Sequence, residues 1–160
     1  MAMRTTLLAL AVATMAGVSG CGDSGGGGGR LSQEEFVQQA DAICSEAEKK
    51  QDAIDVPDLT ASPSDADLEK FADALEEGVS LTRDQIDELR ELTPPEDAGA
   101  EWDKTVDELD ASMDDVDEAA DAARNGDTAG LTKSINEGSV KAESASKRAK
   151  ALGLKSCGSS

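Results

Sequence analysis

Residues 64 to 95 read SDADLEKFADALEEGVSLTRDQIDELRELTPP, and this stretch decides the fold class. Its apolar and small side chains recur in alternating steps of four and three residues, which places them on one face of an α-helix. The series is Leu68, Ala72, Leu75, Val79, Thr82, Ile86 and Leu89. Ser64 stands where a helix N-cap is expected, whereas Pro94 and Pro95 cannot continue a helix. The pattern predicts a long amphipathic helix that follows Ser64 and stops at Thr93.

Three further segments carry the same helical period. Serine and aspartate before a helix can accept its first main-chain N–H groups, proline fits the first helical position, and glycine favours the end. The helix before this stretch should begin at Ser32, with Glu35 in a capping box, and end at residues 56–58. The helix after it should begin at Pro95 and end at Asn125–Gly126. The last helix should begin at Asp127 or Thr128 and end at Gly153.

From Leu31 onward the chain has no strand pattern, and the links between its last three predicted helices are short. Short links favour antiparallel neighbours. We therefore expect an all-α domain over residues 31–157, built as an up-down four-helix bundle and followed by a tail of residues 158–160. The inner face of the last helix is mostly glycine and alanine, so it should add little buried area to the core.

Residues 1–20 have the layout of an export signal. They contain one cation, Arg4, then an apolar run from Leu7 to Val18, then small residues. A permanent membrane span needs about 20 apolar residues, and this run is shorter. The segment is therefore predicted to be a signal peptide.

The run ends in Val18-Ser19-Gly20-Cys21, which resembles the lipobox of bacterial lipoproteins. The resemblance implies cleavage between Gly20 and Cys21 and a diacylglycerol on the sulfur of Cys21, which would hold the protein at the outer face of a membrane. Residues 21–30 would then form the lipidated cysteine and a flexible glycine-rich linker. The alternative is an ordinary signal peptide, with Cys21 kept as a free or paired thiol.

The chain has three cysteines, so one is left unpaired in an exported protein. Lipidation of Cys21 would leave Cys44 and Cys157 as a matched pair. Their bridge would close a loop of about 110 residues and supply about 4 to 5 kcal/mol in the chain-entropy model. It would also require the chain after the last helix to fold back along the first helix. The alternative is two reduced thiols.

Composition excludes several classes of function. The formal net charge is −19, which disfavours binding to nucleic acid or to anionic lipid. The chain contains no histidine, the usual general base near neutral pH and a frequent metal or haem ligand. We expect no cofactor, no metal site and no catalytic residue.

A stripe of aspartates lies beside the core positions of the third predicted helix: Asp103, Asp107, Asp110, Asp114, Asp117 and Asp121. The fourth carries a complementary set of cations: Lys133, Lys141, Lys147, Arg148 and Lys150. We expect these charges to favour pairing of the two helices. A cation-binding face and adaptation to high salt are alternatives. Trp102 is expected to be a core anchor, with ligand stacking as the alternative.

The layout resembles small exported helical proteins and lipoproteins of actinobacteria through four features: Ala40-Asp41-Ala42-Ile43-Cys44, Thr93-Pro94-Pro95, Asn125-Gly126-Asp127, and Leu152-Gly153-Leu154 before Cys157. The resemblance implies a fold and a location but carries no catalytic residues. We expect a membrane-anchored, extracytoplasmic, non-enzymatic module that binds an envelope protein or a small ligand. The alternative is a structural, charge-bearing envelope component with loose cation binding.

Overall fold

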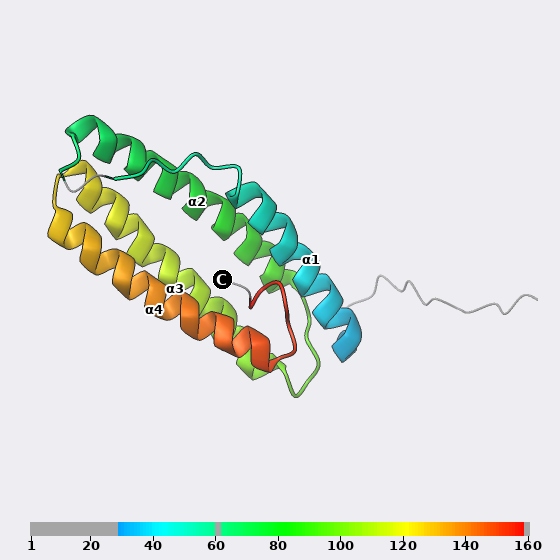
Figure 1. Ribbon diagram of the computed structural model, residues 1–160. Coiled ribbons are helices and arrows are strands. Elements are labelled where there is room, and N and C mark those ends of the chain that lie inside the picture. Colours follow the sequence, from blue (N-terminus) through cyan, green and yellow to red (C-terminus); the bar gives the residue numbers. More distant parts are fainter. Residues whose placement is uncertain (1–28, 60–61, 159–160) are drawn as a thin grey trace, which may run out of the picture.

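The computed structural model describes residues 29–59 and 62–158, which form an all-α domain with no strand in this part of the chain (Figure 1). The helices are α1 (Gln33–Gln51), α2 (Asp65–Glu91), α3 (Gly99–Arg124) and α4 (Thr128–Ala151). Consecutive helices run in opposite directions, so the predicted up-down four-helix fold is confirmed. The signal peptide, the cleavage position at Gly20 and Cys21, and most of the predicted linker lie outside the described residues.

Two helices begin in reciprocal capping boxes. The Glu35 N–H donates to the Ser32 hydroxyl, and the Glu35 carboxylate accepts from the Ser32 N–H at 2.9 Å, as predicted. These hydrogen bonds from Ser32 lower the pKa of the Glu35 carboxyl below its ordinary value. Ser64 and Asp67 repeat the arrangement at the start of α2, with an aspartate in the position where glutamate is usual.

Two predicted boundaries are wrong. The first helix ends at Gln51, and the chain then turns through Ala53 and Ile54 before residues 56–58. The third begins at Gly99, because Pro95 opens a turn whose carbonyl accepts the N–H groups of both Ala98 and Gly99 at 3.1 Å. The turn over residues 96–98 separates Pro95 from α3, so the helix begins about one turn later than predicted.

The predicted ends of the last two helices are correct. Gly126 and Gly153 have φ angles of 67° and 92°, a left-handed conformation that glycine adopts without steric cost. Between them, the Asp127 carboxylate caps α4 by accepting the Gly130 N–H at 2.9 Å.

The backbone of the first helix comes close to that of only one other helix, although its side chains also reach α3, as the contact of Phe36 with Trp102 shows. It packs against α2, and no Cα atom of α1 lies within 8 Å of a Cα atom in α3 or α4. It is also the shortest helix, so it covers the C-terminal part of α2 and leaves the other part to a second core. The core under α1 contains Phe36, Ala40, Cys44, Ile86, Leu89, Trp102, Val106, Ala149 and Leu154. The second contains Leu68, Ala72, Ala119, Ala120, Ala123 and Leu131.

Small residues bring α3 and α4 together. At Gly138 a Cβ atom would lie 3.2 Å from the Ser112 carbonyl oxygen and 3.3 Å from the Asp115 Cβ. These distances are tighter than ordinary van der Waals contact, so the backbones pack as closely as the side chains permit. The glycine and alanine face of α4 therefore serves close approach rather than area of burial.

Four of the six aspartates of the stripe pair with α2, so the predicted pairing of the stripe with the last helix is wrong. Asp114 and Asp117 lie 3.0 and 2.8 Å from the guanidinium of Arg83. Asp107 and Asp110 lie 3.6 and 2.7 Å from that of Arg90. Each arginine is more than two-fifths exposed, so each pair contributes about 0 to 1 kcal/mol.

Other acids of α3 face α4. Asp115 lies 2.7 Å from the ammonium of Lys141 and raises the pKa of that lysine. Arg148 pairs with Glu108 at 2.9 Å and with Glu101. Hydrogen bonds from Ser144 and then Arg148 lower the pKa of Glu108. These acids recur every seven residues, the period at which a helix returns to the same side.

We expect Gly138→Val to destabilise the domain by about 1 to 3 kcal/mol, because the added methyl groups force α3 and α4 apart. Urea unfolding followed by far-ultraviolet circular dichroism measures this change. Gly78→Val is the matched control, because it makes the same replacement inside α2 at a position where an added Cβ atom would lie an ordinary 3.7 Å from its nearest neighbour, the Cδ1 atom of Ile54. Equal losses in the two variants would contradict close packing at Gly138.

Candidate functional site

The segment after α4, residues 152–158, crosses the molecule from α4 to α1 (Figure 1). The left-handed turn at Gly153 reverses the chain, and Leu154 is then buried at 2 % exposure in the core under α1. Gly158, which the sequence placed in the tail, is buried, and its carbonyl oxygen accepts the Ser146 hydroxyl at 2.9 Å. We call residues 152–158 the C-terminal segment.

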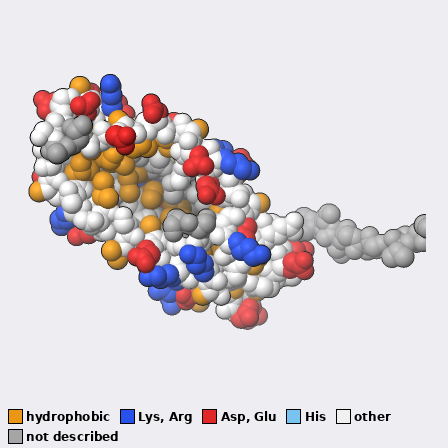
Figure 2. All heavy atoms as spheres, in the orientation of Figure 1, with side chains coloured by type: hydrophobic (Ala, Val, Ile, Leu, Met, Phe, Trp, Pro, Cys, Tyr) orange, Lys and Arg blue, Asp and Glu red, His pale blue; other side chains and the backbone are white. Residues whose placement is uncertain are grey.

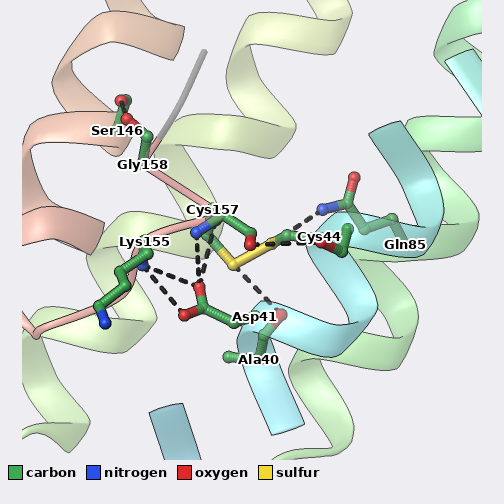
Figure 3. The surroundings of a disulfide bond; sticks show 10 residues. Ala40, Asp41, Cys44, Gln85, Ser146, Lys155, Cys157 and Gly158 are labelled. Atoms are coloured by element: carbon green, nitrogen blue, oxygen red, sulfur yellow. Dashed lines mark hydrogen bonds between the residues drawn. A yellow bond between two sulfur atoms is a disulfide. The ribbon is translucent and has the colours of Figure 1, made fainter. Parts of the chain in front are cut away.

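Asp41 of α1 holds the C-terminal segment through its carboxylate (Figure 3). The carboxylate accepts main-chain N–H groups from three consecutive residues, Lys155 at 2.9 Å, Ser156 at 2.8 Å and Cys157 at 3.4 Å. Hydrogen bonds to a charged acceptor are stronger than those between neutral groups. The single side chain therefore fixes the direction in which the segment reaches the first helix.

The predicted pair of Cys44 and Cys157 is joined in a disulfide, with the two Cα atoms 5.1 Å apart (Figure 3). Cys44 lies three residues after Asp41 and therefore on the same side of α1. The Gln85 amide of α2 donates to the Cys44 sulfur at 3.1 Å. The Cys157 sulfur lies 3.3 Å from the Ala40 carbonyl oxygen, and since a bridged sulfur has no hydrogen, this is a contact. Disulfide and carboxylate together form what we call the clamp.

A pocket of about 390 Å³ lies between the helices beside the clamp. Figure 2 shows hydrophobic side chains gathered in a hollow on the face of the molecule between α2 and the α3–α4 pair. All four helices and the C-terminal segment contribute to the wall of the pocket: Cys44, Glu48, Gln51, Thr82, Gln85, Leu89, Trp102, Thr105, Val106, Leu109, Met113, Ala142, Ala145, Ser146, Ala149, Ser156 and Cys157. Ligand pockets commonly have volumes of about 300 to 1,000 Å³, so this one suits a small molecule.

The pocket has an apolar interior. Leu89, Trp102, Val106 and Ala149 are each no more than 3 % exposed. Trp102 is a core residue as predicted, with its ring edge-to-face with Phe36 at a centroid distance of 5.0 Å. Its indole N–H is covered and has no hydrogen-bond acceptor among the described residues, so it is an unpaired donor in an otherwise apolar part of the core.

The wall is polar near the end of α1 but carries a single ionisable side chain, Glu48. The hydroxyls of Thr82 and Thr105 donate to the main-chain carbonyls of Gly78 and Glu101, each at 2.8 Å. A hydroxyl has one proton, so both oxygens now offer only lone pairs. The wall therefore combines apolar surface with a few polar groups, the acceptor oxygens of these threonines and the amides of Gln51 and Gln85, which donate to Thr82 and to Cys44.

Sequence reasoning missed the pocket. Two signals were present, the small residues of α4 and the short first helix, because both reduce the side-chain volume available to fill the bundle. Among the described residues, no cluster of three or more acids or cysteines has the arrangement of a metal site. No helix in the same ranges is long and apolar enough to cross a membrane.

We expect the double variant Cys44→Ala, Cys157→Ala to lose about 2 to 5 kcal/mol of unfolding free energy, because the bridge closes a loop with a sequence separation of 113. Urea unfolding with and without a thiol reductant measures the loss. The reductant should destabilise the wild type to the same extent and leave the double variant unchanged. A wild type whose unfolding midpoint stays constant after complete reduction would contradict a stabilising bridge.

Comparison with protein-family models, with curated proteins and with solved structures finds no match to this chain. The pocket and the clamp are therefore the observations on which a functional proposal can stand.

Proposed function

We propose that this chain is a lipid-anchored extracytoplasmic binding protein, which is tethered through Cys21 and holds a small ligand in the pocket beside the clamp. The pocket is the observation that carries the proposal. Ala142, Ala145 and Ala149 of α4 border it, and larger side chains at these positions would fill it. A ligand that binds there in the folded chain would stabilise it by mass action.

The anchor rests on the sequence around Val18-Ser19-Gly20-Cys21 and on the glycine run that follows. The clamp supports it indirectly. Because Cys44 and Cys157 are bonded to each other, Cys21 is the remaining cysteine of the three. A disulfide is also typical of an oxidising compartment outside the cytoplasm.

Binding is better supported than catalysis. The wall of the pocket carries one carboxylate and neither histidine, lysine nor arginine, and two of its hydroxyls donate to main-chain carbonyls. This set lacks the pair of nucleophile and base that hydrolytic chemistry requires. We therefore propose a non-enzymatic module.

The alternative, a charge-bearing component that collects cations loosely, has less support. Asp107, Asp110, Asp114 and Asp117 of the predicted acidic face are paired with arginines of α2. A carboxylate beside a guanidinium has a resident counter-charge and attracts a dissolved cation less strongly.

Cys21→Ala should abolish incorporation of a labelled fatty acid into the protein in growing cells, since the sulfur that forms the thioether is removed. Cys157→Ala is the matched control, because it removes another cysteine and keeps Cys21. Gel mobility and label on the purified proteins measure the result. Label that persists in Cys21→Ala would refute the anchor.

Ala145→Leu should weaken binding of a small neutral probe, 4-phenylbutan-1-ol, by at least about tenfold, because the leucine occupies part of the pocket. For the wild type we expect a Kd of about 4 mM or tighter, given about 0.3 kcal/mol or more for each non-hydrogen atom of the probe. Trp102 is the only tryptophan and the chain has no tyrosine, so its emission reports binding at the pocket directly.

Two variants serve as controls for Ala145→Leu. Ala129→Leu makes the same change at an exposed position of α4 and should bind the probe like the wild type. Ala142→Leu also narrows the pocket, at a more exposed position, and replaces Ala145→Leu if that variant unfolds. Undiminished binding in both pocket variants, or no binding by the wild type, would refute the pocket as the ligand site.

A further inference from the structure

We infer that the ligand is a small organic cation, an ammonium compound whose apolar body enters the pocket while its charged group stays beside Glu48 at the end of α1. This inference rests on the proposed function. It adds the chemical class of the ligand, and four observations support it.

The first observation is the sign of the charge. Glu48 is the only ionisable side chain among the residues that line the pocket, and none of these is lysine or arginine. An anion placed here would lose water without gaining a counter-charge, which is strongly unfavourable. The net charge of −19 on the whole chain acts in the same direction, because it repels anions and attracts cations from a distance.

The second observation is the position of Glu48. Glu48 and Gln51 lie in the last turn of α1, at the end where the helix dipole is negative. Lys49 and Lys50 share this turn, but neither lines the pocket, and Lys50 pairs with Glu46 at 3.1 Å. A cation bound beside Glu48 would therefore meet both a carboxylate and the favourable end of a helix.

The third observation is the direction of the hydrogen bonds. The hydroxyl protons of Thr82 and Thr105 are both donated to main-chain carbonyls. The Gln51 amide in turn donates to the Thr82 oxygen at 2.9 Å. The oxygen of Thr105 and the carboxylate of Glu48 can accept hydrogen bonds. An ammonium group has three donors and no acceptor, so it can donate to the Glu48 carboxylate without leaving an acceptor of its own unpaired.

The fourth observation is the apolar depth and the size of the pocket. The inner wall includes Leu89, Trp102 and Val106, and each of these side chains is almost completely buried. A volume of about 390 Å³ equals roughly a dozen water molecules at about 30 Å³ each. The ligand should therefore have on the order of a dozen non-hydrogen atoms, most of them carbon.

The test uses three probes of one shape and different charge: 4-phenylbutylamine, 4-phenylbutan-1-ol and 4-phenylbutyrate. Titration calorimetry and Trp102 emission near physiological ionic strength give the Kd of each. The wild type should bind the amine about two- to fivefold more tightly than the alcohol, which is the range expected for one exposed charge pair. It should bind the acid more weakly than the alcohol.

Two matched variants separate the pocket from the overall field. Glu48→Gln and Glu34→Gln each remove one negative charge from α1, but only Glu48 lines the pocket. Glu48→Gln should abolish the preference for the amine and leave the alcohol unaffected, whereas Glu34→Gln should retain the preference. Equal effects of both variants would overturn the role of Glu48.

The remaining outcomes distinguish this inference from the function on which it rests. If the alcohol or the acid binds as tightly as the amine, and Ala145→Leu weakens that binding, the pocket binds ligands but the cationic class is wrong. If none of the three probes binds, or if Ala145→Leu leaves their binding unchanged, the proposed function fails together with the inference.

Discussion

The clamp between α1 and the C-terminal segment is the interaction on which the rest of the structure depends. Within the described residues, the backbone of α1 approaches that of α2 but of no other helix. It is linked to α4 through the C-terminal segment, which is hydrogen-bonded to the carboxylate of Asp41 and disulfide-bonded to Cys44. These two residues lie about one turn apart on the same side of α1. The bundle is therefore closed by a connecting segment where a bundle is usually closed by direct packing of its first and last helices.

This closure explains why a pocket exists beside the clamp. The C-terminal segment lies between α1 and α4, so the two helices do not close on each other. The residues that α4 presents there, Ala142, Ala145 and Ala149, are too small to fill the distance. The same small face that brings α4 close to α3 at Gly138 leaves space on the side toward α1. One choice of residue sizes on α4 thus produces a tight interface and an open one.

Much of the fold could be predicted because it is encoded locally. The Ser32 and Ser64 caps, the glycine ends at Gly126 and Gly153, and the period of the apolar residues each depend on a few neighbouring positions. The disulfide followed from counting cysteines. The partner of the aspartate stripe did not follow, because periodicity places Asp110 and Asp114 beside the core but does not say which helix lies on that side. The pocket is harder still, since it depends on how far apart the helices stand.

The acidic composition and the pocket act on different parts of a ligand. Many acids of the bundle form ion pairs with basic side chains such as Arg83, Arg90 and Arg148. These acids therefore have less attraction left for dissolved cations. The surplus that gives the chain a net charge of −19 sets only the sign of the field around it, and salt screens that field within about 8 Å. Selectivity must then come from the few groups that a bound molecule touches. Among the residues that line the pocket, Glu48 is the one charged group, so under the proposed function its carboxylate would select the charge of the ligand and the largely apolar wall its shape.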